Sequence, residues 1–259
     1  MTKRYKAPLS VDINGMAARS GVDRVLLTKT VNRYNRIFRG IDLADKRVLE
    51  IGAGTGMLSC LMAVSGAREV VALEPEAAGS SSGALAAFER NLERFGVDNV
   101  ELRPRTFQAA DVEPGSVDVA VLIASVNHLD EDLTPALRDD EAARAEYVRL
   151  FARLVDMMAP GGVVVMYDVG RRNLFSTMAD RFNVPNPLAP RIEWFKHQQP
   201  ALWRDLMVRA GFPSAGVEWN WIIPCFAAAQ DLPLRDSPLF NNAPGSWLTG
   251  SEFVLRARK

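Results

Sequence analysis

The chain has 259 residues, of which 48% are hydrophobic and 24% are charged, and its 31 Lys and Arg residues balance its 31 Asp and Glu residues. This composition is typical of a globular protein and excludes a disordered chain, a collagen and a disulfide scaffold. The net charge of zero argues against a duplex nucleic-acid partner, because affinity for a duplex comes largely from clustered Lys and Arg.

Neither the start of the chain nor its cysteines point to export or to a membrane. The first residues contain no apolar leader segment, and no apolar run reaches the length that spans a bilayer. Cys60 and Cys225 lack the spacing of metal ligands, which favours two structural thiols in a reducing compartment. We therefore expect a cytoplasmic protein with no metal site and no membrane partner.

Short apolar runs alternate with helical patterns over the first two thirds of the chain, which predicts βαβ units and a parallel sheet. A helix with one apolar stripe opens the series, and its stripe consists of Leu27, Val31, Tyr34, Phe38 and Ile41. The predicted strands are Arg47–Ile51, Glu69–Leu73, a weaker one near Val100–Arg105, Val117–Ala124 and Val163–Val169. The helical pattern from Tyr147 to Met158 should end at the turn of residues 159–162, which contains a proline and two glycines.

The pattern changes after Val169. Residues 170–200 contain four prolines and several aromatic residues, which predicts an irregular excursion with a short helix. A helix over residues 200–210 follows, and two further strands, Gly216–Ile223 and Glu252–Arg258, flank a loop-rich stretch at 225–249. Loops of this length in a compact domain are commonly functional, so we expect residues 170–200 and 225–249 to cover the site of an acceptor.

The strongest local pattern is a glycine-rich turn that follows the first strand. Residues 48–56 read Val-Leu-Glu-Ile-Gly-Ala-Gly-Thr-Gly and lead into a helical stretch. Glycines permit positive φ and leave no Cβ, so the backbone can approach a ligand that also meets the amides at the helix start. The second strand then ends at Glu74, where a carboxylate can accept hydrogen bonds from the two hydroxyls of a ribose.

This turn distinguishes two nucleotide-type cofactors. A dinucleotide fingerprint reads G-x-G-x-x-G, whereas here the third glycine comes one residue early and Met57 occupies the expected place. The turn, its spacing and the acidic strand end instead resemble the class I S-adenosylmethionine-dependent methyltransferases, specifically the broad small-molecule group. The resemblance extends over about residues 45–259. It implies a Rossmann-like α/β fold: a doubly wound seven-stranded sheet, mostly parallel with an antiparallel last strand, and helices on both faces.

The resemblance also implies a set of residues that bind S-adenosyl-L-methionine. The turn would hold the methionine part of the cofactor and Glu74 its ribose; the turn residues are Glu50, Gly52, Ala53, Gly54 and Gly56, and Pro75 and Ser125 complete the set. Family members often have Gly-Asp-Ala after the third strand, where this chain has Thr106-Phe107-Gln108. Either Gln108 replaces the aspartate at the adenine, or Phe107 and the backbone grip the ring.

Two histidines are available as a base that takes a proton from a hydroxyl or amine acceptor. His128 follows the fourth strand at its carboxyl end, where doubly wound sheets bind ligands, so we predict it as the catalytic residue. The competing interpretation is a loop histidine that only packs or hydrogen-bonds. For His197, whose neighbours are Trp194 and other aromatic and polar residues, an acceptor pocket competes with helix capping and packing.

Charged pairs and runs complete the candidate residues. Arg171 and Arg172, just after the fifth strand, could bind an acceptor carboxylate or phosphate, with a solvated turn as the alternative. The acidic runs Asp130–Asp132 and Asp139–Glu141 are contiguous, which favours a solvated face over a metal site.

The predicted function is methyl transfer from S-adenosyl-L-methionine to a small-molecule acceptor, at oxygen. The alternatives are N- or C-methylation, a nicotinamide oxidoreductase, and a non-catalytic scaffold with this fold. We expect an N-terminal helical cap at residues 1–44, a core at 45–259, and a monomer or homodimer.

Overall fold

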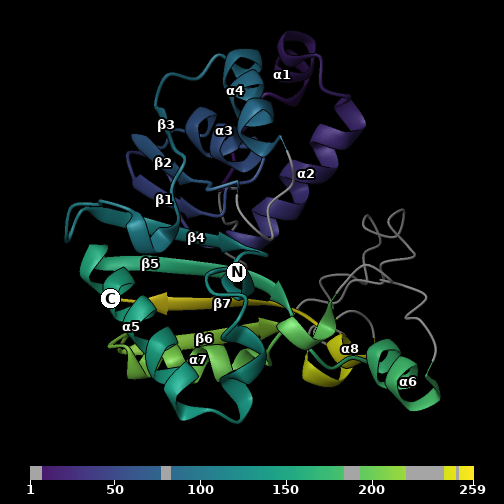
Figure 1. Ribbon diagram of the computed structural model, residues 1–259. Helices are drawn as coiled ribbons and strands as arrows, with labels where there is room; N and C mark the ends of the chain where they lie inside the picture. Colours follow the sequence, from purple (N-terminus) through teal and green to yellow (C-terminus); the bar gives the residue numbers. More distant parts are fainter. Residues whose placement is uncertain (1–7, 77–82, 184–192, 220–241, 249–250) are drawn as a thin grey trace, which may run out of the picture. The chain divides into compact units, whose positions relative to one another are not determined.

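The computed structural model describes residues 8–76, 83–183, 193–219, 242–248 and 251–259. Its strands form one seven-stranded sheet in the order β3-β2-β1-β4-β5-β7-β6 (Figure 1). Strand β1 pairs in parallel with β2 and with β4, β2 pairs in parallel with β3, and β6 pairs antiparallel with β7. The predicted fold class, a mostly parallel Rossmann-like sheet with helices around it, is confirmed.

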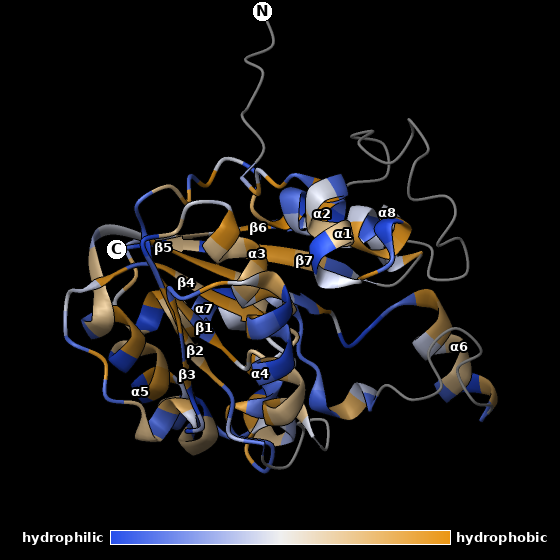
Figure 2. Cartoon of the chain, turned by 90° about the horizontal axis from the view of Figure 1, so that it is seen from above, coloured by the Kyte–Doolittle hydropathy of each residue, from blue (hydrophilic) through white to orange (hydrophobic). Residues whose placement is uncertain are grey.

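The strand predictions hold to within a few residues at most positions. The strands are β1 (Arg47–Ile51), β2 (Glu69–Leu73), β3 (Val100–Arg103), β4 (Val117–Ile123), β5 (Met158–Val169), β6 (Ser214–Trp219) and β7 (Glu252–Arg258). Buried apolar runs form the middle of β5 and β7, and Figure 2 draws both strands as predominantly hydrophobic. The last four residues of the predicted strand Gly216–Ile223 lie outside the described residues.

The start of β5 differs from its prediction. The strand begins directly after the preceding helix, at Met158, and so includes the proline and two glycines that were predicted as a turn. Gly161 has φ +78°, a conformation that side chains rarely adopt. A Cβ at Gly162 would lie 3.0 Å from the carbonyl oxygen of Val117. The glycines therefore permit a bent strand to start close against its neighbour.

The chain divides into two compact units. Residues up to 123 together with 156–165 form the first, here called the N-terminal unit; residues 124–155 and 166–259 form the second, the C-terminal unit. The N-terminal unit contains α1 (Ile13–Ser20), α2 (Arg24–Ile37), α3 (Met57–Val64), α4 (Ala84–Phe95) and the short helix η1 (Phe107–Ala109). The C-terminal unit contains η2 (Val126–His128), η3 (Thr134–Arg138), most of α5 (Glu141–Met157), α6 (Leu174–Phe182), η4 (Trp194–Lys196), α7 (Pro200–Arg209) and α8 (Ala243–Trp247).

The predicted apolar stripe begins on α2 in the N-terminal unit and continues past the end of this helix. The Asp23 side chain caps the helix start by accepting from the Leu26 amide, and Leu27 and Val31 are buried. Phe38 and Ile41 are also buried but lie beyond the helix end. Four of the five stripe residues are therefore buried, while Tyr34 is half-buried and the helix is shorter than the stripe.

An aromatic cluster forms the core of the C-terminal unit. Tyr147 and Phe151 of α5 and Trp203 of α7 are fully buried, with ring centroids 5.4 to 6.3 Å apart. The Tyr147 hydroxyl lies 2.6 Å from the hydroxyl of Thr134, which in turn donates to the carbonyl of Asn127 at 3.0 Å. The cluster thus fixes the loop that follows β4.

Across the described residues, none of the helices has the length and apolar character that a membrane-spanning segment needs.

Candidate functional site

The glycine-rich turn lies at the end of β1 in the N-terminal unit. Gly52, Gly54 and Gly56 have φ of +76°, +55° and +74°, all in the left-handed region that glycine adopts without strain. A Cβ at Gly56 would lie 2.6 Å from ring carbons of Phe88, so the turn packs tightly against α4 there. Among the described residues, a Cβ at Gly54 would meet no atom within 4 Å, so these residues leave open space above the middle of the turn.

The Glu74 carboxylate, predicted to bind the ribose, lies against this turn. Its side chain is 3% exposed, and Oε2 accepts from the Gly54 amide at 2.6 Å while Oε1 accepts from the Glu76 amide at 3.0 Å. The Asn91 side chain of α4 donates to the carbonyl of Thr55 at 2.8 Å and holds the other side of the turn. A carboxylate offers about four lone-pair positions, so Glu74 can accept further hydrogen bonds.

Glu50 is the second buried carboxyl group of this region. It accepts a hydrogen bond from the Ser59 hydroxyl of α3. Its pKa is raised to about 8, chiefly by burial and to a smaller extent by the negative charge of Glu74, while the Ser59 hydrogen bond acts in the opposite direction. Burial and Glu50 likewise raise the pKa of the Cys60 thiol to about 12, which agrees with the prediction of a structural thiol. Cys225 lies outside the described residues.

The remaining predicted cofactor residues are distributed over both units. Phe107 is buried in η1, whose start is capped by the Thr106 hydroxyl, whereas Gln108 is exposed. Pro75 is half-buried next to Glu74. Ser125 is buried at the start of the C-terminal unit. Their roles stay predictions.

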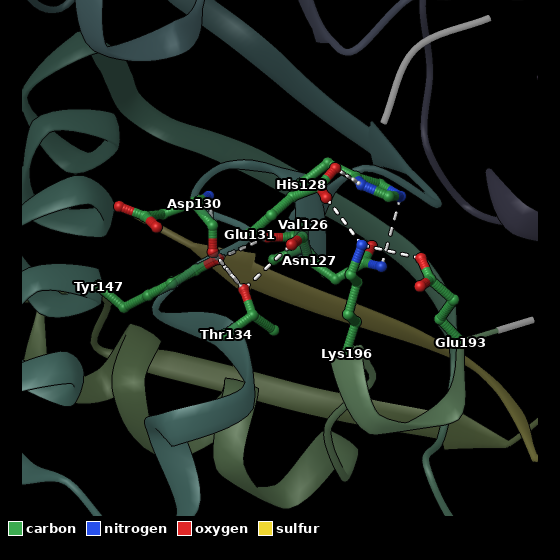
Figure 3. Close-up of polar contacts among 9 residues, drawn as sticks. All are labelled: Val126, Asn127, His128, Asp130, Glu131, Thr134, Tyr147, Glu193 and Lys196. Atoms are coloured by element: carbon green, nitrogen blue, oxygen red, sulfur yellow. Dashed lines mark hydrogen bonds and ion pairs between the residues drawn. The ribbon is translucent and has the colours of Figure 1, made fainter. Parts of the chain in front are cut away.

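His128 belongs to a network of charged side chains in the C-terminal unit (Figure 3). Its Nδ1 lies 2.6 Å from Oε1 of Glu131, whose Oε2 accepts from Lys196 Nζ at 2.9 Å. Lys196 also pairs with Glu193 at 2.8 Å. The Lys196 hydrogen bond, followed by that of His128, lowers the pKa of Glu131. The network joins the loop after β4 to η4 across 65 positions of sequence.

His197 lies against a buried carboxylate that sequence reasoning missed. Asp168, near the carboxyl end of β5, is 2% exposed, and its Oδ1 lies 3.3 Å from Nδ1 of His197. Oδ1 accepts from the Val169 amide at 2.7 Å, while Oδ2 is buried without a partner among the described residues. The Trp194 ring lies 5.9 Å from the His197 ring. The sequence signal that could have identified Asp168 was a single carboxylate inside an otherwise apolar strand.

Arg171 anchors the same segment. Its Nη1 donates to the carbonyl of Phe195 at 2.9 Å, and burial, together with the nearby Arg138, lowers its pKa. Arg172 is exposed, and its carbonyl accepts from the Ser251 hydroxyl at 2.6 Å. Of the predicted acceptor residues, the structure thus brings Arg171, Trp194 and His197 together.

The acidic runs are only partly a solvated face. Asp139–Glu141 is exposed as expected. The expectation is wrong for Asp130 and Glu131, which are half-buried: Asp130 accepts from the Leu133 amide at 3.0 Å, and Glu131 has the ion pairs described above. Among the described residues, His, Cys, Asp and Glu side chains form no group of three or more that could hold a metal ion.

Solved structures identify the class of protein that this fold defines. An S-adenosylmethionine-dependent methyltransferase from Mesorhizobium loti matches with a TM-score of 0.56 and 16% identity, covering 88% of this chain and 98% of its own. A putative S-adenosylmethionine-dependent methyltransferase from Listeria monocytogenes matches with a TM-score of 0.54 and 13% identity, covering 89% and 98%. The [4+2]-cyclase SpnF matches with a TM-score of 0.55 and 15% identity, covering 88% and 80%. The fold is therefore the Rossmann-like methyltransferase fold.

The family follows from the sequence itself. Residues 23–214 match the model of a family described as a methyltransferase domain, and the chain belongs to this family. The predicted enzyme class, a methyltransferase, is confirmed, as is the resemblance to class I S-adenosylmethionine-dependent methyltransferases. No curated protein sequence matches the chain significantly.

Proposed function

We propose that the chain transfers a methyl group from S-adenosyl-L-methionine to a small-molecule acceptor. One observation carries this proposal: a buried carboxylate, Glu74, accepts from the amide of Gly54 in the middle of a turn whose three glycines have positive φ. No atom of the described residues lies within 4 Å of a Cβ built at Gly54, which leaves room among them for a ligand to approach the backbone. The methyltransferase-domain family supports the same conclusion.

The residues of the turn fit this ligand. The buried Glu74 carboxylate supplies negative charge suited to a sulfonium and to ribose hydroxyls, while Glu50, whose pKa is raised to about 8, offers a protonated carboxyl group beside the turn. The residues proposed to hold it are Glu50, Gly52, Ala53, Gly54, Gly56, Glu74, Pro75, Phe107, Gln108 and Ser125. The sulfonium of S-adenosyl-L-methionine supplies a methyl carbon that is already activated for attack. The chain itself then has to bind and orient the acceptor, exclude water and accept a proton.

Oxygen is the proposed methylation position. A hydroxyl acceptor loses its proton on transfer, and each of the two histidines lies beside a carboxylate, His128 beside Glu131 and His197 beside Asp168. Such a pair is suited to general-base catalysis near neutral pH. The half-buried Arg171 and the exposed Arg172 are proposed to bind an anionic group of the acceptor. N- and C-methylation are the competing reactions.

The test combines binding and transfer. Calorimetry should detect binding of S-adenosylmethionine and no binding of NAD, which also tests the nicotinamide alternative. The protein is then incubated with methyl-labelled S-adenosylmethionine and a pool of phenols, alcohols and amines, and products are identified by the mass of one added methyl group. Methylated alcohols or phenols support the proposal, methylated amines redirect it to nitrogen, and cofactor binding without any product supports the scaffold alternative.

A further inference from the structure

Buried polar atoms without partners gather around Asp168 in the C-terminal unit. Asp168 Oδ2, His197 Nδ1 and Trp194 Nε1 are all buried, and no group among the described residues makes a hydrogen bond with them. The distances of 3.3 Å from Asp168 to His197 and 5.9 Å between the His197 and Trp194 rings join the three side chains. Buried polar groups in native proteins nearly always have partners, because an unsatisfied one costs about 1–3 kcal/mol. Such a cluster indicates a place where a polar ligand completes the hydrogen bonding.

We propose that His197 accepts the proton of the acceptor hydroxyl and that Asp168 positions the imidazole ring for this role. The inference rests on the proposed methyl transfer to oxygen. The acceptor oxygen forms a bond to the methyl carbon while the bond from that carbon to sulfur breaks, and its electron pair stays on sulfur. The hydroxyl proton passes to Nε2 of His197. The positive charge thereby moves from the sulfonium to an imidazolium beside the Asp168 carboxylate.

The geometry of the ring supports this assignment. Nδ1 faces Asp168 Oδ1 at 3.3 Å, an ion-pair distance, although the two atoms are not aligned as a hydrogen bond. A carboxylate beside Nδ1 favours the tautomer with the proton on Nδ1, which leaves the Nε2 lone pair available. Nε2 makes no hydrogen bond to any residue within the described ranges. Catalytic hydrogen bonds are often loose before the substrate binds and tighten afterwards.

His128 differs from His197 in the exposure of its side chain and in its hydrogen-bond partners. Its side chain is 33% exposed, whereas that of His197 is 12% exposed. Its Nε2 lies 3.4 Å from the Asn127 side-chain amide, and its partner Glu131 also binds Lys196. Glu131 therefore has a cation to neutralise it already, while Asp168 has no cationic partner among the described residues other than His197. Of the two histidine–carboxylate pairs, the pair of His197 and Asp168 is therefore the one whose carboxylate stabilises a new positive charge on the imidazole.

Contacts on both sides of His197 hold its segment in place. On one side Lys196 binds Glu131 and Arg171 binds the Phe195 carbonyl. On the other side the buried Gln198 side chain donates to the Thr134 carbonyl at 2.6 Å. A base fixed in this way needs little reorganisation when the acceptor binds.

The first test reads the tautomer of each histidine by long-range ¹H–¹⁵N NMR. The untagged protein has only two histidines, so each variant lacking one assigns the other. The neutral His197 ring should carry its proton on Nδ1 in the wild type, and Asp168→Asn should move the population toward the Nε2-protonated form while the His128 signals stay unchanged. The Asn side chain can still accept from the Val169 amide, so the fold should persist. A wild-type His197 with its proton on Nε2 would overturn the proposal.

The second test measures methyl transfer to the pool of phenols, alcohols and amines described above. His197→Ala should lower kcat by roughly 10²–10⁴-fold with the affinity for S-adenosylmethionine unchanged. Asp168→Asn should lower kcat more than it raises KM, and Asp205→Asn, an exposed change on α7, is the matched control that should retain turnover. Near wild-type turnover of His197→Ala, or a loss confined to His128→Ala, overturns the proposal. If the wild type transfers no methyl group, the proposed function fails, and the tautomer measurement still decides whether Asp168 positions His197.

Discussion

The two units treat their buried polar groups differently. In the N-terminal unit the carboxylates at the glycine-rich turn are satisfied by the chain itself: Ser59 donates to Glu50, and two backbone amides donate to Glu74. In the C-terminal unit Asp168, Trp194 and His197 each keep a buried polar atom without a partner among the described residues. The turn is thus preorganised by the protein, whereas the cluster at β5 has buried polar atoms that the described residues leave without partners.

This difference matches the two tasks of a methyltransferase. The methyl donor is common to a large class of enzymes, and a turn of fixed geometry suits one ligand. The acceptor varies from enzyme to enzyme, so its groups cannot be found in a shared pattern. We therefore expect substitutions at the turn to change both stability and cofactor binding, and substitutions at the β5 cluster to change acceptor chemistry at little cost to the fold.

The largest effect is expected at Gly56. Gly56→Ala forces a side chain to adopt φ +74° and places its Cβ 2.6 Å from the Phe88 ring, so the free energy of unfolding should fall by about 1–3 kcal/mol for the backbone and about as much again for overpacking. Gly54→Ala has the same backbone cost at φ +55°, but its Cβ meets no atom of the described residues within 4 Å. Urea unfolding of both variants therefore isolates the Phe88 contact.

Cofactor affinity should rank these two variants in a different order from their stability. Gly54→Ala places a methyl group in the open space above the turn, so calorimetry should detect a loss of S-adenosylmethionine binding larger than its loss of stability suggests. Unchanged affinity in Gly54→Ala would mean that the ligand does not approach this face of the turn.

The next effect is expected at Glu74. Hydrogen bonds to charged groups typically contribute about 1.5–3 kcal/mol each, so Glu74→Ala should weaken S-adenosylmethionine binding at least about tenfold in calorimetry. Glu69→Ala, at the half-buried amino end of β2 and four positions before the strand's last residue, is the matched control and should leave the affinity unchanged. Equal affinities of the two variants would remove Glu74 from the cofactor site.

The same contrast explains how far sequence alone predicts this molecule. The bounds of β1, β2 and β7 were predicted, because strand periodicity and the spacing of turn residues are local properties. The start of β5 was wrong, because a proline and two glycines favour a turn unless tertiary packing bends the strand.

The acceptor region was only partly predictable. Trp194 and His197 lie close together in the chain, and their pairing was visible in the sequence. Asp168 and His197 are 29 positions apart in an irregular part of the chain, and Glu131 and Lys196 are 65 apart, so no periodic pattern connects them. Proximity of this kind depends on how the loops after β4 and β5 fold back, which composition does not encode.

An effect on stability that depends on pH is expected at Glu50. Its pKa is about 8 in the folded protein and near the ordinary 4.5 when unfolded, so between these values the unfolded chain ionises while the folded one keeps its proton. Wild-type stability should therefore fall as pH rises from about 4.5 to about 8. Glu50→Gln, which mimics the protonated group, should not share this loss, so the difference between their unfolding free energies in urea should widen with pH. A difference that is constant with pH would contradict the raised pKa.

The smallest effect on global stability is expected at Lys196 in the C-terminal unit. Its ion pairs with Glu131 and Glu193 lie near the surface, where such pairs contribute little to folding, so Lys196→Met should leave the midpoint of thermal unfolding almost unchanged. The pairs nevertheless connect η4 to the loop after β4, and their loss should allow residues 194–197 to open locally. Hydrogen exchange should detect this as faster exchange of these amides, with Lys196→Arg as the control that retains the charge and the slow exchange. The glycine-rich turn should exchange at its wild-type rate in both variants, because the N-terminal unit satisfies its own buried carboxylates. Faster exchange at the turn would contradict the contrast between a self-sufficient turn and an acceptor region held by side chains from distant parts of the sequence.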